Sequence, residues 1–141
     1  MSALPLSRPE TTTAITRGVM RLWLDQGYAP VGELALANGR RADVAALGPR
    51  GEIVLVEVKS CAADYAVDHK WPEYLEFADA FFFAVGAGFP LELLPEEAGL
   101  IVADGFGGAV LRDAPRAALS PARRKAITIA IARAACLRAC R

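Results

Sequence analysis

The sequence predicts an α/β fold with a mixed central sheet, namely an antiparallel meander of three strands, then a helix and further strands, flanked by helices. Three strand-like runs occupy residues 31–59 and are separated by two turn signals. A helical segment and a continuous apolar run follow them. Helix signals stand at both ends of the chain. A meander followed by a helix and a non-adjacent strand is typical of an α/β sandwich.

The first helix is expected within residues 11–27. Thr11 to Thr13 offer N-cap candidates, and Gly27 ends the apolar pattern. Residues 1–10 carry two prolines and are expected to be a flexible lead-in to a single domain over residues 11–141. The apolar residues of the helix recur at helical spacing: Ile15, Val19, Leu22 and Trp23.

The meander is expected from its turns. Asn38-Gly39 between two strand-like runs is a strong hairpin signal. A second turn is expected at residues 48–51, and the run over 53–59 is rich in β-branched residues. We therefore expect three consecutive antiparallel strands.

Residues 64–79 are expected to form one helix, with Pro72 in its first turn or at a kink. The apolar run over residues 80–85 predicts a strand that is buried on both faces. Two short strands are expected around the turn at 105–108. The last helix is expected to open at Ser120-Pro121, a serine N-cap followed by proline at the first helical position, and to end near residue 137.

The composition predicts a soluble cytoplasmic protein. The chain is 54% hydrophobic and 23% charged, which suits a well-filled core. No run approaches the roughly 18 apolar residues of a membrane span, and the N-terminus lacks the order of a signal peptide. The three cysteines form no CxxC pair, so free thiols are expected rather than a disulfide or a zinc site.

The net charge is zero but unevenly distributed. Residues 1–115 hold 9 basic and all 16 acidic residues, a balance of −7, whereas residues 116–141 hold 7 basic and no acidic residues. A segment this basic is typical of a polyanion partner. A solvated helix that complements the acidic body is an equally good interpretation at this point.

Charged residues near the end of the third strand are the first candidates for chemistry. Because strand residues alternate between faces, Glu57 and Lys59 point to the same side. A three-residue second turn with Gly51 in the left-handed conformation would place Asp43 directly opposite Glu57. Two opposed carboxylates repel each other, and a metal ion between them removes that repulsion. Oxygen ligands of this kind suit Mg²⁺ or Mn²⁺.

Glu33 joins this group only under one condition. A two-residue loop at Asn38-Gly39 would put Glu33 on the face opposite Asp43. A three-residue loop or a bulge would put both carboxylates on one face, with Glu33 diagonal to Asp43.

Several stretches resemble a known family. Asp43 followed by Glu57-Val-Lys59 on a hairpin resembles the PD-(D/E)xK nuclease motif, with Ala42 in place of its proline. Cys61 stands where a small residue such as serine is expected. Over about residues 25–135 the chain resembles the MmcB-like DNA repair family in these stretches: Glu33-Leu34, Asn38-Gly-Arg-Arg-Ala-Asp43, Val56-Glu-Val-Lys-Ser60, Asp64-Tyr65, Asp68-His-Lys-Trp-Pro-Glu-Tyr74, Phe83-Ala-Val85, Ala98-Gly-Leu100, Ala103-Asp104 and Ala122-Arg-Arg-Lys-Ala126.

The resemblance implies a restriction-endonuclease-like sheet and a role for each site residue. Asp43, Glu57 and the Val58 carbonyl would hold Mg²⁺ or Mn²⁺. Glu33 would hold a second metal or orient a water ligand. Lys59 would orient or activate the attacking water and offset charge in the transition state.

DNA is the implied partner. Arg41 and Lys70 are candidates for phosphate contacts, although Arg41 equally suits an ion pair with Asp43. Tyr74 could stack on a base, although its helical spacing with Trp71 favours a core position. Basic residues of the last helix, with Arg123 and Arg124 as the candidates, suit contacts to the DNA backbone. A homodimer and a repair-protein partner also stay open.

Three interpretations of function follow. The first is a metal-dependent DNA endonuclease acting in repair, and the intact Asp, Glu and Lys set favours it. The second is a nuclease-like module that binds DNA or a repair partner with weak or no cleavage. The third is a structural ion network in a small α/β protein.

Overall fold

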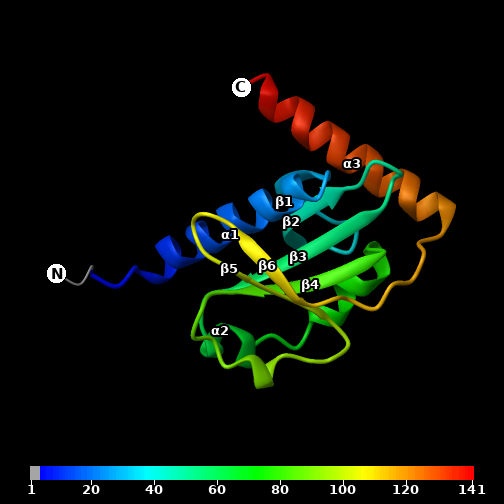
Figure 1. Cartoon of the computed structure of the whole chain (residues 1–141). Coiled ribbons are helices and arrows are strands. Elements are labelled where there is room, and N and C mark those ends of the chain that lie inside the picture. Colours follow the sequence, from blue (N-terminus) through cyan, green and yellow to red (C-terminus); the bar gives the residue numbers. More distant parts are fainter. Residues whose placement is uncertain (1–3) are drawn as a thin grey trace.

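The structure, a computed structural model, describes residues 4–141 and has a single mixed sheet with helices on both faces (Figure 1). The elements follow in this order: α1 (Arg8–Asp25), β1 (Ala29–Ala35), β2 (Arg41–Leu47), β3 (Ile53–Lys59), α2 (Ala62–Ala66), the 3₁₀ helix η1 (Trp71–Phe77), β4 (Ala80–Val85), the 3₁₀ helix η2 (Leu91–Leu93), β5 (Gly99–Ala103), β6 (Gly108–Arg112) and α3 (Pro121–Ala139).

The sheet has six strands in sequence order, and it confirms the predicted class. The strands β1, β2 and β3 form the expected antiparallel meander. β4 then pairs with β3 in parallel, β5 pairs with β4 in parallel, and β6 closes the edge antiparallel to β5. Parallel neighbours need a crossover, which the segment containing α2 and η1 supplies between β3 and β4.

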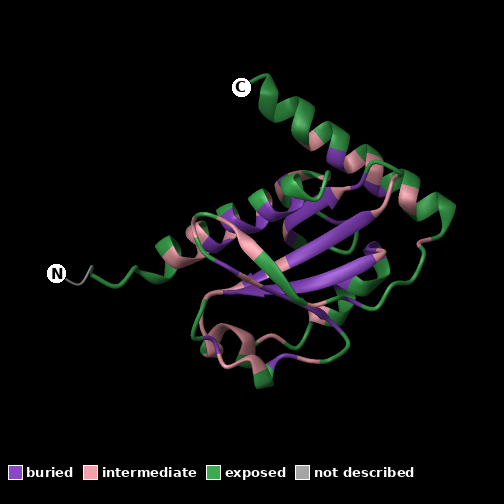
Figure 2. Ribbon diagram, in the orientation of Figure 1, coloured by how far each residue is buried: buried purple, intermediate pink, exposed green. Residues whose placement is uncertain are grey.

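Two apolar cores lie on the two faces of the sheet. On one face, α1 packs Ile15, Val19 and Trp23 against the alternate β3 residues Val54, Val56 and Val58. On the other face, η1 and α3 cover the remaining core side chains. The central strands are buried almost throughout, while the outer half of α3 is exposed (Figure 2). The face of β3 that carries Glu57 and Lys59 is therefore the face under η1.

The first helix begins earlier than the sequence predicts. Ser7 is its N-cap and forms a capping box with Glu10, and Pro9 lies in its first turn. Thr11 to Thr13 are therefore not caps but lie inside the helix. Residues 8–10 belong to the helix rather than to a flexible lead-in, and residues 1–3 of that lead-in lie outside the described residues.

The single helix expected over residues 64–79 is wrong. The segment instead forms α2 and η1, separated by residues 67–70. Asp68 accepts the backbone N–H of Lys70 at 2.9 Å, which replaces a helical hydrogen bond by a turn. Pro72 has no N–H to donate and disfavours α-helical backbone at Trp71. Both effects interrupt the helix at the same place.

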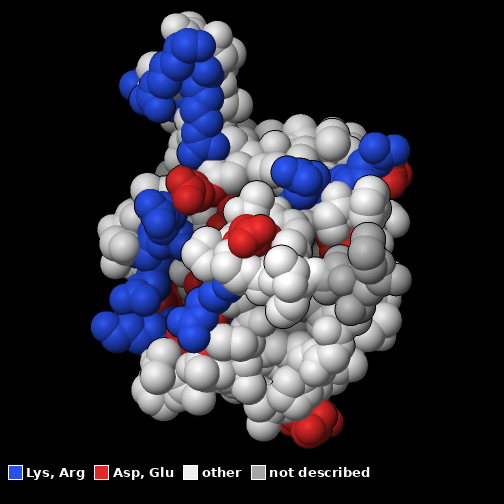
Figure 3. All heavy atoms as spheres, turned by 90° about the vertical axis from the view of Figure 1, so that its left-hand side faces the viewer, with Lys and Arg blue, Asp and Glu red and all other residues white. Residues whose placement is uncertain are grey.

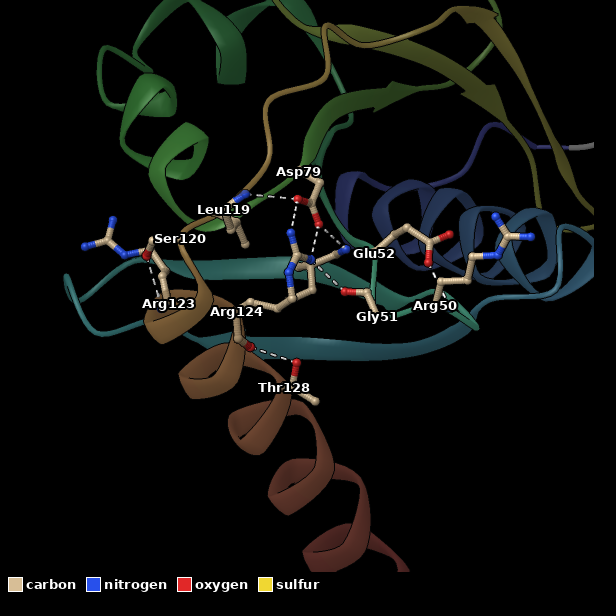
Figure 4. A network of polar contacts seen from close by, with 10 residues as sticks. Arg50, Gly51, Glu52, Asp79, Leu119, Ser120, Arg123, Arg124 and Thr128 are labelled. Atoms are coloured by element: carbon tan, nitrogen blue, oxygen red, sulfur yellow. Dashed lines mark hydrogen bonds and ion pairs between the residues drawn. The ribbon is translucent and has the colours of Figure 1, made fainter.

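The last helix begins as predicted, with Ser120 as N-cap and Pro121 at the first position. Its first turn is fixed to the sheet by Arg124, which donates two 2.6 Å hydrogen bonds to Asp79 and one of 2.8 Å to the Gly51 carbonyl (Figure 4). Asp79 also accepts the N–H of Ile53 at 2.8 Å. From this anchor α3 runs outward, and its C-terminal end stands clear of the body (Figure 1).

Among residues 4–141, no helix is both long enough and apolar enough to cross a membrane.

Candidate active site

The strands β2 and β3 separate at the end that carries the candidate residues. Their ladder runs from Leu47↔Ile53 to Val44↔Val56 and stops there. Continuing the register would place Val58 opposite Ala42, with the Val58 N–H directed to β2. That N–H instead donates to the Asp43 carboxylate, Oδ2, at 2.7 Å. The Asp43 side chain thus occupies the opening where the ladder would have continued.

Asp43 and Glu57 meet in this opening, as the sequence predicts. The second turn has the expected three-residue form, because Gly48 N–H bonds the Glu52 carbonyl at 2.8 Å and Gly51 has φ +90°. The two carboxyl groups are within hydrogen-bonding reach of each other. Burial, followed by the hydrogen bond and the negative charge of Asp43, raises the pKa of Glu57 to about 9. Without a cation, one proton therefore holds the pair together at neutral pH.

Tyr74 holds the carboxyl group of Glu57 in place instead of stacking on a nucleotide. Its hydroxyl donates to Glu57 Oε2 at 2.8 Å and lies 3.0 Å from the Arg41 carbonyl. Only 4% of the residue is exposed, and burial followed by the charge of Glu57 raises its pKa. The predicted stacking of Tyr74 on a nucleotide is thus wrong, and the core position that its spacing favoured is confirmed.

Lys59 shares the face of Glu57, but its ammonium is already paired. Lys59 Nζ lies 2.8 Å from Asp68 Oδ2, and the two side chains are only 12% and 13% exposed. Burial alone would raise the pKa of Asp68, but the bonds from Lys59 and the Lys70 N–H outweigh it and lower the pKa. Asp68 is not among the site residues that the sequence predicts. This partnership could not be seen from spacing, because it depends on the break between α2 and η1.

The first hairpin has a loop longer than two residues, which is the condition for Glu33 to join the site, but Glu33 is not placed diagonal to Asp43 as expected. The first hairpin has the three-residue loop 37–39, closed by Leu36 N–H to the Arg40 carbonyl at 2.8 Å. The pairs on either side of Glu33 place it directly opposite Asp43 rather than diagonal to it. Glu33 has φ +50°, a left-handed conformation that is unusual for a residue other than glycine, and its side chain is exposed.

The donor set suits a hard cation. Residues 52, 54, 56 and 58 direct their backbone groups toward β2, so the Val58 carbonyl faces the same opening as Asp43 and Glu57. Within the described part of the chain, no three side chains of His, Cys, Asp or Glu are gathered to hold a metal. A site here would therefore rest on two carboxylates, one carbonyl and water, which is a usual way of holding Mg²⁺.

The residues expected to bind nucleic acid divide into two groups. Arg124 is held by Asp79, and Arg123 bonds the Glu76 carbonyl at 3.0 Å, so both fasten α3 to the body. Arg41 and Lys70 are exposed, and neither forms an ion pair with any residue that the structure describes, Asp43 included. One face of the molecule shows basic side chains along one flank and on the projecting end of α3, with acidic atoms between them (Figure 3).

The chain is similar to known proteins over nearly its whole length. A family model described as DNA repair protein MmcB-like matches residues 3–141. A solved structure, "SPO1766 protein of unknown function from Silicibacter pomeroyi", is 43% identical, with a TM-score of 0.89 over 96% of this chain and 90% of that chain. No curated protein matches the chain.

Proposed function

Since this chain belongs to the MmcB-like DNA repair protein family, we propose that it is a metal-dependent DNA endonuclease of the PD-(D/E)xK type that acts in repair. One observation carries the proposal: the carboxyl groups of Asp43 and Glu57 meet where β2 and β3 separate, beside the Val58 carbonyl. Two half-buried carboxyls that need a proton to coexist are a natural place for a divalent cation. Repair is the part of the proposal that comes from the family.

Asp43, Glu57 and Val58 would hold Mg²⁺ or Mn²⁺, which supplies an acidified water and a positive charge against the phosphate. Tyr74 keeps Glu57 directed at the opening through its 2.8 Å hydrogen bond. Asp43 is kept in place by the Val58 N–H. Both proposed ligands are thus oriented by hydrogen bonds from neighbouring groups, which is the support that a metal site needs.

Lys59 and Glu33 have supporting roles. The Lys59 ammonium lies on the same face as Glu57, and its positive charge opposes the rise in the pKa of Glu57. It is therefore close enough to stabilise negative charge there. Glu33, opposite Asp43 on the exposed side, would orient a water ligand or hold a second cation. Homodimer formation and a repair-protein partner stay predictions.

A second candidate, a nuclease-like DNA-binding module with little cleavage, is favoured by a specific observation. The Lys59 ammonium is bonded to Asp68 in a largely buried pair. A lysine held in this way is less able to reach an attacking water.

The test compares wild type with Asp43→Asn and Lys59→Met on single-stranded and duplex DNA, in Mg²⁺, in Mn²⁺ and in chelator. Glu92→Gln and Lys125→Met serve as matched controls, because both replace exposed residues far from β3 in sequence. The endonuclease proposal requires metal-dependent cleavage that both site variants lose by about 100-fold or more and both controls keep. Cleavage that persists in chelator, or in both site variants, would refute it. Binding without cleavage in either metal would favour the second candidate.

A further inference from the structure

A cavity of about 720 Å³ has Asp43 among its lining residues. Its walls come from α1, from the kinked part of β1 and from the last turns of α3. Glu33 and Asp43 line it, so one end of the cavity is the edge of the candidate active site. The projecting end of α3 stands over this side of the molecule (Figure 3).

The other lining residues are suited to phosphate oxygens. Arg17 on α1 lines the cavity together with Arg138 near the end of α3 and Arg141 just beyond it. Between them lie Thr12, Thr13 and Thr16 of α1, and the Thr16 hydroxyl donates to the Thr12 carbonyl at 2.7 Å. Neither Arg17 nor Arg141 forms an ion pair or a side-chain hydrogen bond with a described residue, so both guanidinium groups are available to a ligand.

The far wall of the cavity is fixed in place. Arg138 donates hydrogen bonds to the carbonyls of Gly32 and Glu33, the latter at 3.0 Å. These bonds tie the end of α3 to the kink of β1, and they leave the charge of Arg138 uncompensated by a carboxylate. The seven basic residues of segment 116–141 thus have different roles, since Arg123 and Arg124 anchor the start of α3 and Arg138 and Arg141 line the cavity.

We propose that this cavity binds the phosphodiester backbone of a single DNA strand and leads it to Asp43. The inference deepens the proposed function, on which only the chemistry at Asp43 rests. Guanidinium groups on opposite walls can contact one backbone from two sides. A duplex, which is stiff over about 50 nm, would meet only the rim of a space enclosed by two helices. A flexible single strand can enter it.

The experiment measures binding of a fluorescent oligothymidylate, and of a labelled duplex of the same length, by anisotropy across a series of salt concentrations. Chelator is present so that no cleavage occurs. Arg17→Ala/Arg141→Ala removes one cavity charge from α1 and one from the residues that follow α3. The matched control is Arg21→Ala/Arg133→Ala, which removes one charge from α1 and one from α3 outside the cavity lining. Thermal unfolding of each variant checks that the fold is kept.

The control is expected to match wild type. The cavity variant is expected to bind more weakly, with the slope of log affinity against log salt reduced by about 1.4, from about 0.7 for each lost single-strand phosphate contact. A second variant, Arg138→Gln, removes a different cavity charge and is expected to lower the slope by about 0.7. Equal slopes for the cavity and control variants would overturn the proposal. A loss seen only with duplex DNA would overturn the single-strand assignment.

Binding and cleavage fail separately. Cleavage by wild type with no effect of the cavity arginines on binding would refute the cavity and leave the nuclease proposal standing. Binding that depends on the cavity arginines, by a protein that does not cleave DNA, would support the cavity and refute the nuclease proposal.

Discussion

Replacing Glu57 by glutamine should stabilise the metal-free protein while it removes a proposed metal ligand. Glutamine has the shape of a protonated glutamic acid. Its amide can donate to Asp43, as the carboxyl proton does, and its carbonyl can accept from the Tyr74 hydroxyl. The variant therefore keeps the contacts of the neutral form and cannot ionise.

The size of the effect follows from the two pKa values. Glu57 has a pKa of about 9 in the folded protein, against about 4.3 in an unfolded chain. Because the folded pKa is raised, the contribution of this group is complete below about pH 4 and is lost as the pH rises toward 9. Each pH unit in that window costs about 1.4 kcal/mol. At pH 7 the wild-type protein should thus be less stable than Glu57→Gln by about 4 kcal/mol.

The assay is urea unfolding in chelator from about pH 5 to about pH 9, over which the group titrates. The free energy of unfolding of wild type should fall with pH relative to the variant, and the two curves should meet near the acid end. Glu92→Gln, an exposed change, should run parallel to wild type. Adding Mg²⁺ should stabilise wild type and leave Glu57→Gln unchanged, because binding to the folded state requires the ionised carboxylate.

A variant that is less stable than wild type across the whole range, or that shows the same dependence on pH, would refute the shared proton. Stabilisation of Glu57→Gln by Mg²⁺ as large as that of wild type would show that the ion binds elsewhere.

Three further outcomes are expected. Asp79→Asn should lower the free energy of unfolding by about 2 kcal/mol at neutral pH, measured by denaturant titration. Because the hydrogen bond from Arg124 lowers the pKa of Asp79, the difference in stability between wild type and variant should shrink as the pH falls below about 4. Gly18→Ala should destabilise the fold by about 3 kcal/mol in thermal unfolding, since an added Cβ would overlap the Asp104 carbonyl. Tyr74→Phe should cost about 1 kcal/mol of stability and weaken Mg²⁺ affinity by about tenfold in calorimetry.

The meeting of Asp43 and Glu57 could be predicted because it depends on local rules. Gly51 fixes the length of the second turn, and strand alternation then fixes which side chains oppose each other. The same reasoning stated the condition for Glu33 correctly. It missed the direct opposition of Glu33 and Asp43, because a three-residue loop can lie at 37–39 or at 38–40, and only the loop at 37–39 pairs these two residues.

The segment between β3 and β4 could not be predicted in the same way. The apolar spacing of Trp71, Tyr74 and Ala78 indicates a helix, but the side chain of Asp68 and the ring of Pro72 act on backbone conformation at one point. The pairing of Lys59 with Asp68 follows from that break. Sequence spacing describes continuous elements well and says little about contacts made by the irregular backbone between them.

The basic tail shows a further limit. Arg123 and Arg124 stand out in the sequence as an adjacent pair, yet their partners, Glu76 and Asp79, lie more than 40 positions away along the chain. Arg138 and Arg141 attract less notice and lie beside Asp43 instead. Which arginines are available to a ligand is decided by tertiary contacts, and no periodicity of charge records those.

The bond from the Val58 N–H to Asp43 has a consequence for how variants of this site are interpreted. Deleting the carboxylate, as in Asp43→Ala, would leave that N–H without its acceptor, and the nearest remedy is for β2 to close onto β3 through the Ala42 carbonyl. The space for a cation would then be lost together with one of its ligands. Asparagine keeps an acceptor for Val58 and so keeps the strands apart. A difference in Mg²⁺ affinity between Asp43→Ala and Asp43→Asn would measure how far this aspartate keeps β2 and β3 from pairing beyond Val44 and Val56.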